Sequence, residues 1–303
     1  MRLAAIDIGS NAARLLVSDI IPGPQNAPEF VKVALVRVPL RLGFDVFDRG
    51  LISAARIEKI IKTVRAYKLL LDVYEVKHVK ACATSAMRDA ANAEEVIRKV
   101  KQETGITIEI ISGQQEASLI YENHIAENMT ANESYLYIDV GGGSTELTFF
   151  SDGRLVFKES FNIGTIRILK NQVTEANWDA MKEFIAKNTK GYHHVTAIGS
   201  GGNINKIFSL SKKKEGKPLT LDLLRSYYRE FSSMTVEQRI SLYKLREDRA
   251  DVIVPALLVY INVMRWAEAF EIYVPKIGLA DGLIHILYEE VRESRKTAPA
   301  DEA

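Results

Sequence analysis

A hairpin pattern that occurs twice constrains the fold of this 303-residue chain more than any other feature. Near the N-terminus an apolar strand ends in Asp7, and the segment DIGSNAAR at 7–14 leads into a second apolar run. From residue 134 the same order returns, with Asp139 opening the segment DVGGGSTE at 139–146. This repeat predicts a two-copy duplication rather than a short-period solenoid.

Strands and helices alternate within each half of the chain. In the first half we expect strands at 2–9, 14–20, 30–38, 76–84 and 106–112 and helices at 53–71, 92–105 and 114–129. In the second half we expect a strand hairpin at 134–150, a helix at 175–190, a strand at 194–201, mainly helical sequence at 219–270, a strand at 271–278 and a closing helix from 279. This alternation predicts an α/β fold in which mixed sheets are flanked by helices.

Composition excludes several classes of protein. The formal net charge is +1, so the chain lacks the overall basic field of many nucleic-acid-binding proteins, and any anion site must be local. Cys82 is the only cysteine, which excludes an intrachain disulfide framework and a multi-cysteine metal site. The N-terminus lacks a signal-peptide pattern, and no apolar run approaches the ~20 residues that span a bilayer. We therefore expect a soluble cytoplasmic protein without a nucleic-acid or membrane partner.

The two glycine loops have the composition of phosphate-binding loops. Without a Cβ atom, backbone N–H groups can converge on an anion. The residues that would supply amides and polar side chains are Ser10 and Asn11 in the first loop and Gly141, Gly142, Gly143, Ser144 and Thr145 in the second. A tight hairpin also needs glycine, so one such loop is weak support. Two loops at equivalent places favour a shared phosphate cleft.

Acidic residues lie at both loops. Asp7 and Asp139 each end an apolar strand, where an unpaired carboxylate is costly to bury. One interpretation is an aspartate that bonds to its own turn. The other is a hard oxygen site for Mg²⁺, with Mn²⁺ as an alternative ion, joined by Glu146. Two acids facing one phosphate site favour the metal interpretation.

Three further charged residues are of the kinds that a phosphate site needs. Arg14 leaves the first loop with a guanidinium group suited to phosphate. Arg88 follows a buried strand and is either a phosphate ligand or a surface arginine. Glu116 lies in the first turns of a helix, where an acid is also favoured by the helix dipole.

At these residues the chain resembles the exopolyphosphatase/guanosine pentaphosphate phosphohydrolase (Ppx/GppA) family of the actin–sugar kinase–Hsp70 superfamily. The matching segments run in order from residue 3 to about 284: DIGSNAAR, ATSAMR, ISGQQEASLIY, IDVGGGSTEL, GTIR, GSGGN, RADVIVPA and GLADGLI. The resemblance implies duplicated actin-like (ribonuclease H-like) domains at 1–125 and 126–283 with a cleft between them. It also implies that the last helix, 284–303, packs back on the first domain.

The family's functional residues fall on positions already singled out. Glu116 resembles the base or positioner of the attacking water. Asp7, Asp139 and Glu146 resemble the magnesium ligands.

Three arginines match family positions as well. Arg14 and Arg88 resemble phosphate contacts, and Arg249 resembles an arginine near the substrate entrance. Ala12 and Ala13 depart from a more usual serine-containing loop, so one hydroxyl contact to phosphate is absent.

The resemblance implies a hydrolase that releases terminal orthophosphate from inorganic polyphosphate or guanosine pentaphosphate. The alternatives are an ATP-dependent kinase or ATPase of the same superfamily, and a non-catalytic nucleotide sensor. Glu116 favours water attack, because a sugar kinase does not require it. The choice of substrate and of chain length stays open. A homodimer is also open, since amphipathic helices at 219–245 could form a dimer face, although such a stripe is more often core.

Overall fold

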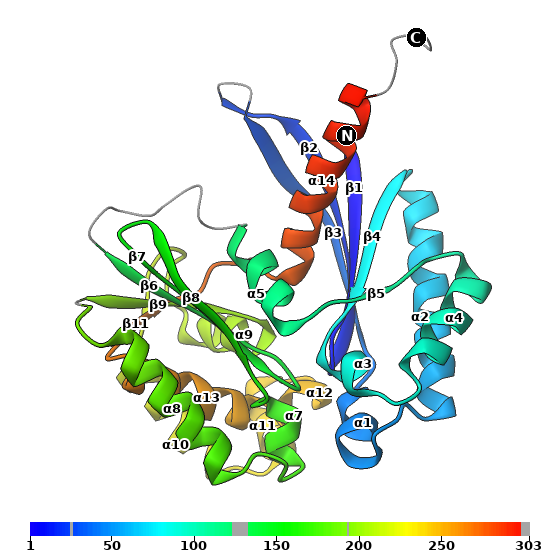
Figure 1. Cartoon of the computed structure of the whole chain (residues 1–303). Helices are drawn as coiled ribbons and strands as arrows, with labels where there is room; N and C mark the ends of the chain where they lie inside the picture. Colours follow the sequence, from blue (N-terminus) through cyan, green and yellow to red (C-terminus); the bar gives the residue numbers. More distant parts are fainter. Residues whose placement is uncertain (25–26, 123–132, 193, 298–303) are drawn as a thin grey trace.

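The computed structural model describes residues 1–24, 27–122, 133–192 and 194–297. Within them the chain forms two lobes, each built on a mixed β-sheet with helices packed against it (Figure 1). The domain boundary expected at 125/126 falls in the stretch 123–132, outside the described residues. None of the described helices is both long and apolar enough to cross a bilayer.

The sheet of the first lobe has the order β3-β2-β1-β4-β5. Its strands are β1 (Arg2–Ile8), β2 (Ala12–Pro22), β3 (Pro28–Pro39), β4 (His78–Ala83) and β5 (Glu109–Ile110). β1, β2 and β3 pair antiparallel, whereas β4 pairs parallel to β1 and β5 parallel to β4. The strand expected at 106–112 is reduced to the two residues of β5, which pair with the last two residues of β4.

The second sheet repeats this arrangement, in the order β10-β11-β9-β6-β7-β8. Its strands are β6 (Ser134–Val140), β7 (Thr145–Ser151), β8 (Arg154–Phe161), β9 (Val195–Ser200), β10 (Leu219–Thr220) and β11 (Glu271–Tyr273). Taken from β8 to β11, strand order and direction match β3 to β5, and β10 adds an antiparallel edge. The chain therefore has the duplicated actin-like fold expected from the sequence.

Helices connect the strands of the first sheet, and two of them cover its outer face. The connecting helices are α1 (Gly43–Arg49), α2 (Ala54–Val73), α3 (Ser85–Asp89) and α4 (Ala93–Thr104). Apolar side chains of α2 and α4 share one core with alternate residues of β1 and β2, as the period of two along a strand requires. The helices expected at 53–71 and 92–105 are thus confirmed within a residue or two.

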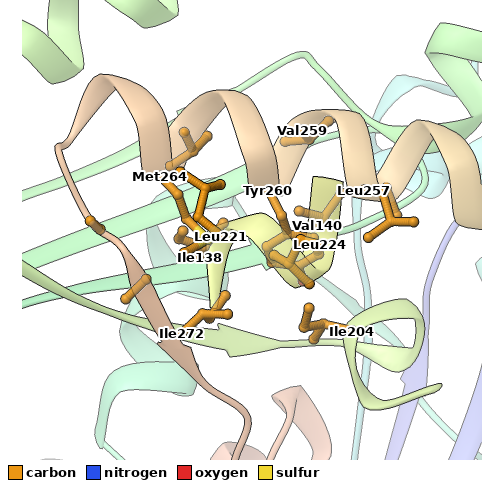
Figure 2. Close-up of a cluster of buried hydrophobic side chains, with 14 of the residues drawn as sticks. Ile138, Val140, Ile204, Leu221, Leu224, Leu257, Val259, Tyr260, Met264 and Ile272 are labelled. Atoms are coloured by element: carbon orange, nitrogen blue, oxygen red, sulfur yellow. The ribbon is translucent and has the colours of Figure 1, made fainter. Parts of the chain in front are cut away.

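The main core of the second lobe is formed by its sheet and several helices. The helices of this lobe are α7 (Thr165–Leu169), α8 (Glu175–Thr189), α9 (Gly202–Ser211), α10 (Leu221–Ser232), α11 (Val236–Tyr243), α12 (Glu247–Ala250) and α13 (Ile253–Trp266). Figure 2 shows Tyr260 and Met264 of α13 packed over Ile138 of β6, with Leu224 of α10 beside them. The apolar stripe of α10 is therefore buried inside the lobe, which leaves it unavailable as a dimer face.

Two helices link the lobes. α5 (Gly113–Glu122) leaves the first sheet and packs on β7 and β8 of the second; the part of this helix expected at 123–129 lies outside the described residues. α14 (Leu279–Thr297) returns to the first lobe, where its apolar face covers β1 and β2 (Figure 1). Residues 298–303 of the expected last helix are not among those described.

The strand expected at 271–278 ends earlier, at Tyr273. Pro275 follows two residues later and cannot donate a hydrogen bond to a neighbouring strand. The freed segment 274–281 forms one wall of the cleft between the lobes.

Candidate active site

The first sheet carries a row of charged side chains beside its glycine loop. Asp7 on β1 is the register partner of Arg14 on β2, and Arg14 is the partner of Arg37 on β3. Directly paired residues project from the same face of a sheet. Arg14 Nη1 donates to Asp7 Oδ1 at 2.8 Å, and Asp7 Oδ2 has no hydrogen-bond partner among the described residues. This row presents two guanidinium groups to the cleft.

The equivalent row of the second sheet is acidic. Asp139 on β6 pairs with Glu146 on β7, which pairs with Ser160 on β8. The Ser160 hydroxyl donates to Glu146 Oε1 at 2.9 Å, and Glu146 Oε2 has no partner in the described part of the chain. The same position in the two hairpins thus holds an arginine in one lobe and a glutamate in the other.

The two glycine loops have the same turn and touch each other. The Gly9 amide donates to the Ala12 carbonyl at 3.0 Å, and the Gly141 amide donates to the Ser144 carbonyl at 2.9 Å. A Cβ atom on Gly142 would lie 2.8 Å from the Ser10 Cβ. Glycine at this position therefore allows the two lobes to approach closely at the floor of the cleft.

The expected loop residues divide into two groups. Those that line the cleft are Ser10, Asn11, Gly141, Gly142 and Ser144. Gly143 is packed against Phe47 and Ser85 of the first lobe, and Thr145 is fully buried, with its hydroxyl donating to the Ile163 carbonyl at 2.5 Å.

The polar side chains of the first loop bond to protein groups. Ser10 Oγ lies 2.8 Å from Ser85 Oγ and accepts a hydrogen bond from the Ala86 amide. Asn11 Nδ2 donates to the Asp248 carbonyl at 2.9 Å. The first loop is therefore fastened to α3 on one side and to α12 of the other lobe on the other.

Glu116 is brought to the acidic row by α5. It is 8% exposed, and its side chain forms a group with Asp139 and Glu146 in which one oxygen from each lies within 4.8 Å of the others. Glu116 Oε2 has no partner among the described residues. Asp7 is outside this group of three and pairs with Arg14 instead.

Burial and mutual repulsion disfavour the ionised forms of these acids. Burial, followed by the charges of Glu146 and Asp139, raises the pKa of the Glu116 carboxyl well above its ordinary value, while Arg88 opposes the shift. Burial, then the charge of Asp139, raises the pKa of Glu146 to about 7. Burial also raises the pKa of Asp139 and, against the effect of Arg14, that of Asp7.

A divalent cation fits the group of three acids. The donors are hard carboxylate oxygens, two of them without a protein partner, and a bound cation would offset the repulsion among the buried charges. Glu116, Asp139 and Glu146 can therefore hold a metal ion. The sequence analysis singled out all three acids, but it also counted Asp7 among the metal ligands, because Asp7 heads an equivalent loop.

Arg88 and Arg249 differ in their contacts with the cleft. Arg88 Nη1 donates to the Ile111 carbonyl at 2.7 Å, and Arg88 is not part of the cleft wall, although its charge acts on Glu116 and Glu146. Arg249 lines the cleft against the first turn of α9. Burial, and then the neighbouring arginines, lower the pKa of Arg249 to about 10.

The cleft has a volume of about 980 Å³ and walls from both lobes. The cleft is also lined by basic residues that the sequence analysis did not identify: Lys32, Arg37, Lys206, Lys213, Lys244, Arg246 and Lys276. They come from separate segments and follow no local motif. The overall charge of +1 gives no sign of a basic wall, because acidic residues elsewhere in the chain balance it. An anionic ligand would meet many cations along the cleft and a group of acids at one place.

A model of the Ppx/GppA phosphatase family matches residues 25–290. The chain belongs to this family. It is 29% identical over 256 residues to a bifunctional 3-dehydroquinate synthase/phosphatase of Fusobacterium nucleatum, a match covering 79% of this chain and 38% of that protein. It is 26% identical over 304 residues to exopolyphosphatase 1 of Mycobacterium tuberculosis, covering 94% and 87% of the two chains.

Among solved structures, the Ppx/GppA family member of Aquifex aeolicus superposes with a TM-score of 0.73 at 28% identity. The match covers 97% of this chain and 98% of that one. The resemblance inferred from the sequence motifs is thus confirmed, and the chain is a Ppx/GppA family hydrolase.

Proposed function

We propose that this Ppx/GppA family phosphatase releases terminal orthophosphate from a linear phosphoanhydride, either inorganic polyphosphate or guanosine pentaphosphate. One observation carries the proposal: Glu116 and Asp139, two members of the buried group of three acids, line the same cleft as an extended basic wall. The acids suit a cation at the reacting phosphate. The basic wall suits the rest of an anionic chain.

In this proposal Glu116, Asp139 and Glu146 hold Mg²⁺, for which Mn²⁺ can substitute. A divalent ion bound there would neutralise charge on the phosphate oxygens and help to orient the reacting group. Asp7, expected from the sequence to be a metal ligand, would act through Arg14, to which it is hydrogen-bonded.

The chain's own residues would bind and align the substrate. Arg14 would contact the phosphoryl group that is transferred, while Arg88, held by the Ile111 carbonyl, would lower the charge around the acids. Backbone amides of the two glycine loops would hold the chain in line. Such positioning and charge stabilisation supply most of the catalysis of phosphoryl transfer.

Glu116 would orient the attacking water. A loose transition state asks little of a base, so a carboxylate of modest basicity suffices. Its position beside the two loop acids is compatible with a water held between the carboxylate and the reacting phosphorus. A sugar kinase of the same superfamily does not require an acid at this place, so Glu116 favours water as the nucleophile.

The test is phosphate release with Mg²⁺ from polyphosphate, guanosine pentaphosphate and ATP, measured side by side. Glu116→Gln should lower kcat by at least about 10²-fold and leave substrate binding nearly unchanged. Glu109→Gln, the same substitution at an exposed glutamate on β5, is the matched control. Release from ATP alone would favour a kinase or ATPase, and release from none of the three would favour a sensor. A fully active Glu116→Gln enzyme would contradict the role of Glu116.

A further inference from the structure

Three successive carbonyl groups of the second glycine loop are bound by α7 of the same lobe. The Gly141 and Gly142 carbonyls accept from backbone amides of the first turn of α7, at 3.0 and 2.8 Å. The Gly143 carbonyl accepts from the side chain of Arg167, whose Nε atom lies 2.7 Å from it. Two of the three carbonyls are therefore held by backbone and the third by a side chain.

The bound carbonyls fix the direction of the loop amides. In a trans peptide unit the carbonyl oxygen and the next N–H group point in opposite directions. The amides of Gly142, Gly143 and Ser144 therefore point away from α7, and they donate to no acceptor within the described part of the chain. Gly142 and Ser144 line the cleft. Successive free amides of this kind are suited to binding an anion.

The first glycine loop is held in a different way. Its Asn11 carbonyl, which corresponds to that of Gly143, accepts from the backbone amide of Arg41 at 2.8 Å. No substitution by a residue other than proline removes that donor. Arg167 is the only donor to the Gly143 carbonyl among the described residues. Because glycine has wide backbone freedom, the second loop depends on this side chain to keep one conformation.

The same guanidinium group reaches the first lobe. Its Nη2 atom donates to Asp89, the last residue of α3, and its Cζ atom lies 4.2 Å from the centre of the Phe47 ring of α1. Arg167 does not line the cleft, so it acts on a bound anion through the loop. One side chain thus joins the second loop to two helices of the other lobe.

We propose that Arg167 is a positioning residue that holds the second glycine loop in its anion-binding conformation through the Gly143 carbonyl. Its contacts with Asp89 and Phe47 make this conformation depend on the association of the lobes. The choice of phosphate as the anion rests on the function proposed above, in which Arg167 itself has no part.

A role limited to joining the lobes predicts something different. Arg41 also pairs with an aspartate across the lobes, Asp251, and its Cζ atom lies 4.0 Å from the centre of the Phe44 ring. The Arg41 side chain thus has the same two kinds of contact as Arg167 but does not bond to a loop carbonyl. If Arg167 only joined the lobes, Arg167→Met and Arg41→Met would have the same effect on anion binding.

The experiment titrates inorganic phosphate into protein labelled with ¹⁵N-glycine in excess EDTA and follows the amide resonances by NMR. Phosphate should shift the Gly142 and Gly143 resonances in a saturable manner. Arg167→Met should weaken phosphate binding about tenfold or more, as expected when a charge-assisted hydrogen bond that holds the site is lost. Arg41→Met, the matched control, should leave the affinity unchanged.

Two further variants separate the contacts of Arg167. Arg167→Lys retains a cation beside Asp89 and Phe47 but lacks the Nε donor, so it should fold and still bind phosphate more weakly. Asp89→Asn removes the ion pair and keeps the bond to Gly143, so its affinity should change less than in Arg167→Lys. If Arg167→Met fails to fold, the comparison of Arg167→Lys with Arg41→Met decides.

Unchanged phosphate affinity in the Arg167 variants, or equal weakening in Arg41→Met, would overturn the positioning role. Phosphate binding that leaves Gly142 and Gly143 unshifted would do the same. The readout is independent of hydrolysis. Weakened binding in Arg167→Met, in a protein that releases phosphate from no substrate, would retain the role of Arg167 and refute the hydrolase. Phosphate release by a protein whose phosphate affinity is independent of Arg167 would do the reverse.

Discussion

Arg14 and Glu146 occupy the same position in the two halves of the duplicated fold, each as the cross-strand partner of the aspartate that ends the first strand. Arg14 is a cation that lines the cleft, and Glu146 is an acid of the buried group whose other two members, Glu116 and Asp139, line it. In the first lobe the aspartate is neutralised by its partner, through a bond of 2.8 Å. In the second, two acids face each other and Glu116 adds a third. The duplication therefore places two side chains at equivalent positions in the two sheets, and these side chains carry opposite charges.

The presence of Glu146 in the acid group suggests that Ser160, which bonds to it, positions Glu146 for metal binding. Ser160→Ala removes the hydroxyl that donates to Glu146 Oε1 and should weaken Mn²⁺ binding about 10- to 100-fold, the usual effect of losing a group that orients a metal ligand. Titration calorimetry with Mn²⁺ measures the effect directly. Ser226→Ala, at a serine of α10 whose hydroxyl donates to the Asp222 carbonyl, is the control. Unchanged Mn²⁺ affinity in Ser160→Ala would show that Glu146 is held by other contacts.

The stability gained from a metal ion should depend on pH. The pKa of Glu146 rises from 4.5 to about 7 on folding, so this group favours the metal-free folded state most below pH 4.5, and that contribution is lost as pH rises through 7. Mg²⁺ competes with the protons and should stabilise most where the acids are ionised. We expect Mg²⁺ to raise Tm by roughly 2–5 °C more at about pH 8 than at about pH 5.5.

Calorimetric scans with and without Mg²⁺ at both pH values test this expectation. Glu146→Gln provides the control, since its metal-free protein should lose the fall in stability that Glu146 causes between the two pH values. An equal Mg²⁺ effect at both pH values would place the binding site away from the buried acids.

The contact between the second glycine loop and the helices α1 and α3 should tolerate no added atom at Gly143. A Cβ there would lie 2.4 Å from the Phe47 ring and 2.5 Å from Ser85 Oγ, both in the first lobe. Gly143→Ala should therefore destabilise the protein by about 1–3 kcal/mol and lower kcat by moving the second loop away from the first lobe. Gly278→Ala, where a Cβ would meet no atom within 4 Å, should be nearly neutral in stability. Denaturant unfolding measures both variants, and equal stability of the two would contradict the packing argument.

The strongest predictions from the sequence were those that depend on short-range patterns. The two hairpins, the strand-end aspartates and the helices α2 and α4 lie where periodicity and glycine content indicated. Asp139 and Glu146 were singled out at the second loop and Glu116 in the first turns of a helix, and the structure brings the three together. Asp7 was grouped with them because it heads an equivalent loop, yet its neighbour on β2 is an arginine rather than an acid.

What the sequence determined by itself was the duplicated fold, the pair of loops and the identity of the acids, because each is encoded within a hairpin or a few helical turns. Tertiary structure alone decided which acids meet, and it assembled the basic wall from Arg37, Lys206 and Arg246. These residues are distant in sequence and follow no common spacing. They share a cleft only because α5 and α14 bring the two sheets together, and electrostatic interaction depends on distance in space rather than along the chain.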